Sequence, residues 1–159
     1  AMAGVMLSEI DITKAEYPSS LHKYAGLDVA SDGQGRSRKK EHLEDSEYVD
    51  AEGEVKVKKG ITFNPFLKTK LVGVLGSSFI KQSPDKCVYR KIYDDYKHRL
   101  EHMDAHKEKS KGHRHNMAVR YMVKMFLVDL YNAWRRIEGL PVAPTYSEAK
   151  LGKVHKIAA

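Results

Sequence analysis

Cysteine is nearly absent from the sequence, because Cys87 is the only one in 159 residues. One thiol excludes an internal disulfide and a zinc site built from several cysteines, and it suits a reducing compartment. The sequence also lacks an apolar run long enough to cross a bilayer, and it lacks the charged, apolar and small-residue pattern of a signal peptide. We therefore expect a cytoplasmic protein with no membrane partner.

The chain has fewer acidic than basic residues. The chain has 28 Lys and Arg against 21 Asp and Glu, which gives a formal net charge of +7 and a pI near 9.4. This excess favours an anionic partner, of which nucleic acid is the commonest, although a basic but inert surface is the alternative. With 42% hydrophobic residues, a chain of this length suits one domain with a real core.

The spacing of apolar residues predicts a mostly α-helical fold, a single domain of three long and two short helices with a β-hairpin insertion. The expected long helices cover residues 64–82, 84–106 and 116–138. The first short helix ends between residues 10 and 13, and the second covers 18–25. Residues 104–115 read as an exposed polar connection. The expected divisions are the end of a helix-hairpin-helix-like platform (1–30), a charged insertion (31–63), a helical core (64–140) and a basic tail (141–159). The first residues resemble the middle of a helix, so we expect a fragment of a longer chain.

The expected helix 64–82 carries the candidate reactive residue. Its apolar face comprises Leu67, Leu71, Val74, Leu75 and Phe79, with Ser78 inside this stripe, and its flank carries Lys70, Gly73, Ser77 and Lys81. A hydroxyl one turn from an ammonium group, with glycines at 73 and 76 leaving room for an approaching backbone, can hold or attack a phosphate. Ser77 is the candidate nucleophile. In the alternative interpretation, glycine and serine only mark close helix packing and the basic flank is solvated.

Residues 31–60 change composition twice, from basic to acidic and back to basic. Tyr48, Val49, Val55 and Val57 flank residues 50–53, and this pattern predicts a hairpin with Gly53 in the turn. The basic residues could form an arm that contacts nucleic acid or a self-neutralising solvated insertion, and the sequence leaves both open. They are Arg36, Arg38, Lys39 and Lys40 on one side and Lys56, Lys58 and Lys59 on the other.

The expected helix 84–106 carries a tyrosine stripe and a histidine row. Tyr89, Tyr93 and Tyr96 are expected in the core, with stacking on a base or sugar as the alternative. His98, His102 and His106 recur every four residues, a spacing that can place two imidazoles on one metal. Only Glu101 or Asp94 could complete such a site, so we expect no metal; a histidine-rich face near phosphates and plain solvent exposure are the other interpretations. Arg120 and Lys124 lie off the apolar face of the last helix.

Five segments in register resemble the C-terminal transposase domain of the insertion sequence 110 family, also labelled 116/110/902. They are AMAGVMLSEIDI with YPSSLHKYAGL, a basic glycine-containing segment, NPFLKTKLVGVLGSS, YRKIYDDYKHRL and GHRHNMAVRYMVKMFL. In that family an Asn-x-x-Leu-Arg helix start leads to a serine, and aligning Asn64 and Leu67 with this motif places the serine on Ser77. Lys68 stands where the family usually has arginine, Phe63 replaces a glycine, and the acidic insertion is longer.

The resemblance implies DNA recombination and transposition by an RNA-guided enzyme. Ser77 would attack a phosphodiester and form a phosphoserine link, while Lys70 and Lys81 stabilise the phosphorus charge. The implied partners are DNA, a guide RNA and further copies of the full-length protein. The resemblance implies no cofactor in this chain, because Mg²⁺ would bind a separate RNase H-like domain. The expected phosphate contacts are Lys68, Lys70, Lys81, Arg36, Arg38, Lys39, Lys40, Arg120 and Lys124. The alternatives are a non-catalytic nucleic-acid-binding or assembly module and a histidine metal-binding protein.

Overall fold

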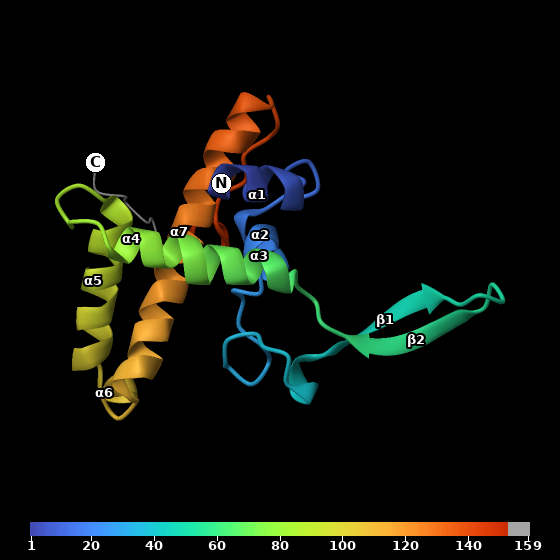
Figure 1. Ribbon diagram of the computed structural model, residues 1–159, viewed down its shortest axis with the longest axis horizontal. Helices are drawn as coiled ribbons and strands as arrows, with labels where there is room; N and C mark the ends of the chain where they lie inside the picture. The colour runs from blue at the N-terminus through green and yellow to red at the C-terminus, as the bar shows by residue number, and fades with distance from the viewer. Residues whose placement is uncertain (153–159) are drawn as a thin grey trace.

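Helix α7 (Lys111–Ile137) is the element on which the others pack. The computed structural model describes residues 1–152, without the side chains of residues 146, 147 and 151. In Figure 1, α7 runs the height of the molecule; α2, the α3–α4 helix and α5 lie against it, and α1 packs on the α3–α4 helix. Its buried stripe is Ala118, Val119, Met122, Val123, Leu127, Val128 and Tyr131. The mostly α-helical fold with one hairpin confirms the fold class predicted from the sequence.

The start of α7 corrects the prediction, since the helix begins at Lys111 and not near residue 116. The Ser110 side chain caps the helix by accepting a hydrogen bond from the His113 backbone N–H at 3.2 Å. Gly112 therefore lies in the first turn, where an orphan backbone group is already satisfied by the cap. The residues expected as a connection instead contribute this turn and the short helix α6 (Asp104–Lys107).

Helix α5 (Val88–His102) is shorter at both ends than the predicted helix 84–106. Cys87 has an extended backbone with φ −135° and ψ 109°, and Met103 is extended with φ −83° and ψ 127°. Pro84 therefore lies in the turn before α5, and the chain bends between α5 and α6. Tyr93 and Leu100 of α5 are buried, and the helix packs along α7.

The predicted helix 64–82 is one continuous rod made of α3 (Pro65–Thr69), η2 (Lys70–Gly76) and α4 (Ser77–Ile80) (Figure 1). The Asn64 side chain caps it by accepting from the Leu67 N–H at 3.0 Å. The middle segment, η2, is π-helical, so its turns are wider than α-helical turns. A wheel of 3.6 residues per turn therefore fails past Lys70. Val74 is 48% exposed and Ser78 is exposed, although both were predicted in the core stripe.

The N-terminal platform is held to α7 by polar side chains as well as by its apolar ones. It comprises α1 (Met2–Glu9) and α2 (Pro18–Tyr24), which are joined by a link containing the buried Ile12 and Ala15. The Tyr131 hydroxyl donates to the carbonyl of Glu16 at 2.6 Å, and Arg135 donates to two further carbonyls of the link. The first helix was predicted to end between residues 10 and 13, and α1 ends at Glu9 with Ile10 as its C-cap.

The predicted hairpin is present as antiparallel strands β1 (Glu44–Val49) and β2 (Val55–Gly60), with Gly53 in the turn at φ +83°. It projects away from the helices in Figure 1. A loop with the 3₁₀ turn η1 (Lys40–His42) leads into it, and the buried His42 ring ties this loop to Ser37 and Asp32. The last described element is α8 (Tyr146–Leu151). Among residues 1–152, no helix is both long and apolar enough to cross a membrane.

Candidate nucleic-acid interface

Ser77 lies on the outer face of the rod, at the first position of α4. Its side chain is exposed, and its hydroxyl has no hydrogen-bond partner among the residues that the structure describes. The neighbouring Gly76 is buried against α7: a Cβ there would lie 3.1 Å from Val119 Cγ1. Close packing is therefore confirmed for Gly76. At Gly73 a Cβ would meet nothing within 4 Å, so the outer face is open there.

The end of the rod is anchored beneath Ser77 by an aromatic cluster. The Phe79 ring lies 4.7 Å from the Tyr89 ring and 5.6 Å from the Phe126 ring, measured between centroids. Arg90 caps the C-terminal end of α4 by donating to the carbonyl of Ile80. The sequence did not single out Arg90, because a cap between two helices depends on how they pack. These contacts hold the backbone of Ser77 in place.

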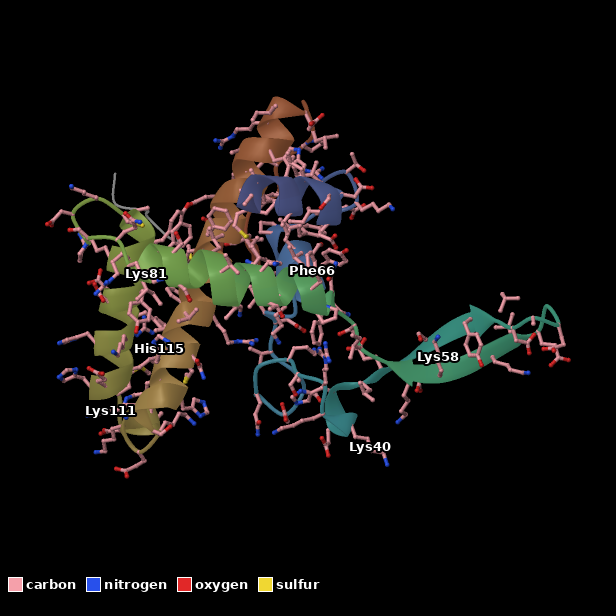
Figure 2. The ribbon with its side chains drawn as sticks, in the orientation of Figure 1. Lys40, Lys58, Phe66, Lys81, Lys111 and His115 are labelled. Carbon is pink, nitrogen blue, oxygen red and sulfur yellow. The ribbon has the colours of Figure 1, made fainter. Side chains whose placement is uncertain are left out.

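The basic residues predicted around Ser77 take different positions. Lys81, one turn after Ser77, is exposed, and Figure 2 shows it at the α4 end of the rod. Lys70 places its Nζ 5.3 Å from the centre of the Phe66 ring, toward the α3 end. Lys68 is directed inward: its Nζ donates to the carbonyl of Arg36 at 2.7 Å. Burial, and then the charge of Arg120, lowers the pKa of Lys68 to about 8, and this geometry argues against a direct phosphate contact.

Arg36 is buried rather than presented to solvent, with 9% of its surface exposed. Its guanidinium pairs with Asp28 at 2.8 Å and with Glu44 at 3.2 Å, and the hydrogen bond to Asp28 raises its pKa. It thereby fixes the loop that precedes β1. Arg38, Lys39 and Lys40 are exposed on this loop, and Lys40 points away from the helices in Figure 2.

Some of the hairpin lysines interact with acidic or aromatic side chains of the hairpin itself. Lys56 pairs with Asp50 in the turn, and the Lys58 Nζ lies 4.7 Å from the centre of the Tyr48 ring (Figure 2). Lys59 is opposite Asp45 in the strand register. Both interpretations of this insertion therefore stay open, since all these side chains are exposed enough to contact another molecule.

Arg120 and Lys124 come together at a basic hollow that the sequence did not reveal. It has a volume of about 850 Å³ and lies between the loop 27–39, α5 and the first half of α7. Its cationic and imidazole side chains are Lys39, Lys109, Arg120, Lys124, His106 and His113, and none of the described residues that line it is Asp or Glu. Ser77 does not line this hollow.

The Arg120 side chain extends from α7 to the loop 27–39 and lines the hollow where the two meet. Its Nη2 donates to the carbonyl oxygens of Gly26 at 3.3 Å and Asp28 at 3.2 Å, and a Cβ on Gly35 would lie 2.8 Å from its guanidinium carbon. Burial lowers the pKa of Arg120. Burial, followed by the positive charge of Arg120, also lowers the pKa of Lys124. The two cations thus repel one another in a partly desolvated place.

An aromatic pair forms another wall of the hollow. The rings of Tyr96 and Tyr121 stack with centroids 4.0 Å apart and planes 11° apart. Tyr96 is only partly buried, as are Tyr89 and Tyr121, whereas the prediction of a core position is confirmed for Tyr93. Tyr121 was not identified from the sequence, because its position beside Tyr96 depends on the pairing of α5 with α7.

The histidine row does not converge on a common point. The rings of His98 and His102 stack 4.2 Å apart, and the His102 Nδ1 lies 2.8 Å from the carbonyl of His98. His106 is on α6, beyond the bend at Met103, and lines the hollow. Within residues 1–152, no three His, Cys, Asp or Glu side chains are grouped to hold a metal ion.

His22 of α2 contacts the Lys124 backbone, and its burial leads us to expect that the stability of the protein depends on pH. Its Nε2 is 3.1 Å from the Lys124 carbonyl, and burial lowers its pKa from 6.5 to about 4. The unfolded chain therefore binds a proton more readily than the folded one. The free energy of unfolding should fall by up to about 3 kcal/mol as pH drops from 6.5 to 4.

Chemical denaturation across this pH range measures the effect. The His22→Gln variant retains a donor for the Lys124 carbonyl but does not titrate, so its loss should be smaller by about the amount assigned to His22. Equal pH dependence in the two proteins would contradict this assignment.

Comparison of the chain with protein-family models, with curated proteins and with solved structures finds no match.

Proposed function

We propose that this chain is the C-terminal catalytic and DNA-binding domain of an RNA-guided transposase that uses Ser77 as its nucleophile. The observation that carries the proposal is that the Ser77 hydroxyl is exposed and has no hydrogen-bond partner among the described residues. The preceding residue, Gly76, is packed against α7 and fixes the backbone there. A nucleophile on an anchored backbone can be held at a fixed distance from a phosphate. The resemblance in the five sequence segments supports the same residue.

The proposed chemistry is a transesterification in two steps. The Ser77 Oγ forms a bond to phosphorus, the bond from phosphorus to one strand oxygen breaks, and that oxygen takes a proton to become a hydroxyl. A hydroxyl of another strand then attacks the phosphoserine and releases Ser77, which regains its proton. The number of phosphoester bonds is unchanged, so no external energy source is needed.

The charge that develops on the phosphate oxygens needs cations close to Ser77. Lys81 is one turn away and exposed, and Lys70 lies on the same rod toward Phe66. The proposed role of Lys81 is to stabilise the phosphorane charge; Lys70, expected in the same role, is seven residues before Ser77 with its Nζ beside Phe66. The Mg²⁺ implied by the resemblance belongs to the RNase H-like domain, and the described residues of this chain bring no cluster of ligands together for it. A guide RNA, further copies of the protein and a cytoplasmic location belong to the same proposal.

The proposal is tested by looking for a covalent adduct between DNA and Ser77. The complete transposase is incubated with guide RNA, Mg²⁺ and labelled DNA, then denatured and digested with trypsin. We expect DNA-linked phosphate on the peptide of residues 71–81, and fragmentation should place it on Ser77. An adduct on any other residue, or none during active strand exchange, would reject this nucleophile.

A non-catalytic nucleic-acid-binding or assembly module is the second candidate. The observation that favours it is the basic hollow, which gathers cations away from Ser77. Such a module should bind nucleic acid with a steep salt dependence, because each phosphate contact releases counterions. It would show this binding without ever forming the adduct.

A further inference from the structure

We propose that the basic hollow binds a single nucleic-acid strand, with phosphates on its cations and a base stacked on the Tyr96–Tyr121 pair. The proposal rests on the nucleic-acid-binding part of the proposed function and adds a second contact surface to it, and it does not depend on Ser77 being catalytic.

The first support is the arrangement of charge. Cations reach the hollow from three segments: Lys39 from the loop, Lys109 from the connection before α7, and Arg120 with Lys124 from α7. An open hollow with its cations spread over three segments suits a chain of repeated phosphates better than one small anion. Its volume of about 850 Å³ is also near the upper end of the range for small-molecule sites, about 300–1,000 Å³.

The second support is the excess of positive charge inside the hollow. Arg120 and Lys124 are partly buried, and each has its pKa lowered by burial. Asp28 is the carboxylate that acts on both, but it is already paired with Arg36 at 2.8 Å. A bound phosphate would add negative charge beside these two partly buried cations, where charges interact more strongly than in open water.

The third support is the polar and aromatic lining. The His106 Nδ1 is buried and has no hydrogen-bond partner among the described residues, and His106 lines the hollow. The stacked tyrosines offer an aromatic face of the kind on which bases of single strands stack. The first turn of α7, with Ser110 and Gly112 at the hollow, adds the positive end of a long helix. Bases in a duplex are already stacked on each other, so this combination favours a single strand.

The phosphate contacts are tested with the full chain and a fluorescent strand of eight thymidines, by anisotropy at several salt concentrations. The double variant Lys39→Gln with Lys109→Gln should bind about tenfold more weakly, and its salt slope should fall by about 1.4, or 0.7 per phosphate contact. Lys14→Gln with Lys91→Gln removes the same charge from exposed residues that do not line the hollow. Equal losses in the two double variants would overturn the proposal.

The stacking contact is tested with Tyr121→Leu and Tyr121→Phe. Loss of the ring should weaken binding of the thymidine strand about tenfold, whereas Tyr121→Phe keeps it. An abasic strand of the same length should bind the original protein and Tyr121→Leu equally. A circular dichroism melting curve confirms that each variant is folded. The proposal is overturned if the abasic strand binds as tightly as the thymidine strand, or if an eight-base-pair duplex binds more tightly than either. Neither outcome bears on the Ser77 adduct.

Discussion

If the proposed function holds, replacement of Ser77 by alanine in the full-length protein should reduce strand exchange by roughly 10⁴-fold or more, the scale seen when a nucleophilic serine is removed. The reason is that, in the proposed mechanism, the Ser77 Oγ forms the phosphoserine bond and alanine has no hydroxyl. Binding of DNA should stay within a few-fold, because the hydroxyl carries no charge. Strand exchange and DNA affinity are measured on the same preparations.

Ser78→Ala is the matched control, because Ser78 is the next residue of α4 and is also exposed. It undergoes the same change in side chain and in helix propensity, which for either serine is worth only about 0.5 kcal/mol of stability. We expect nearly full activity from Ser78→Ala. If Ser77→Ala remains active, or if both variants lose activity equally, then Ser77 is not the nucleophile.

Replacement of Arg135 by methionine should lower the free energy of unfolding by about 3–5 kcal/mol. Arg135 is only 6% exposed and donates to three carbonyl oxygens: Pro141 at 2.6 Å, Ile12 at 3.0 Å and Ala15 at 2.7 Å. Methionine fills much of the volume but leaves these carbonyls without a donor. The cost is reduced, though not removed, because a buried charge is lost at the same time. Urea denaturation gives the free energy.

Arg136→Met is the control, since the next residue of α7 is exposed. Its loss should stay within about 0.5 kcal/mol, as for most surface substitutions. Hydrogen exchange adds a local measurement, because Arg135→Met should release the link between α1 and α2 before the rest of the chain. Equal stability of the two variants would show that the three carbonyls find other donors.

The predicted ends of elements were correct at some positions and wrong where two local signals conflicted. The helix start at Asn64 and the turn at Gly53 were predicted from the sequence, and the structure adds the Asn64 side-chain cap and the positive φ of Gly53. The start of α7 was predicted too late, because Gly112 and the surrounding charges resemble a loop. The Ser110 cap, six residues before the predicted start, outweighed that composition.

The wheel placed Ser77 correctly on the surface but placed Val74 and Ser78 wrongly in the core. A regular period of 3.6 is the only assumption available from a sequence, and the π-helical segment η2 breaks it. The prediction of phosphate contacts from charge alone failed in another way, because it treated a buried cation as exposed. It grouped Arg36 with Arg38 and Lys39, although Arg36 is buried on Asp28.

The sequence by itself determined the helical class, the hairpin, the main amphipathic faces and an excess of positive charge, because each depends on composition or on spacing within a few residues. Only the tertiary structure decided which cations face solvent and which are enclosed by protein. It also brought Lys39, Tyr96, Lys109 and Lys124 around one hollow. Such residues meet through the packing of α5 and the loop against α7, and the pairing of distant segments leaves no periodic signal in a single sequence.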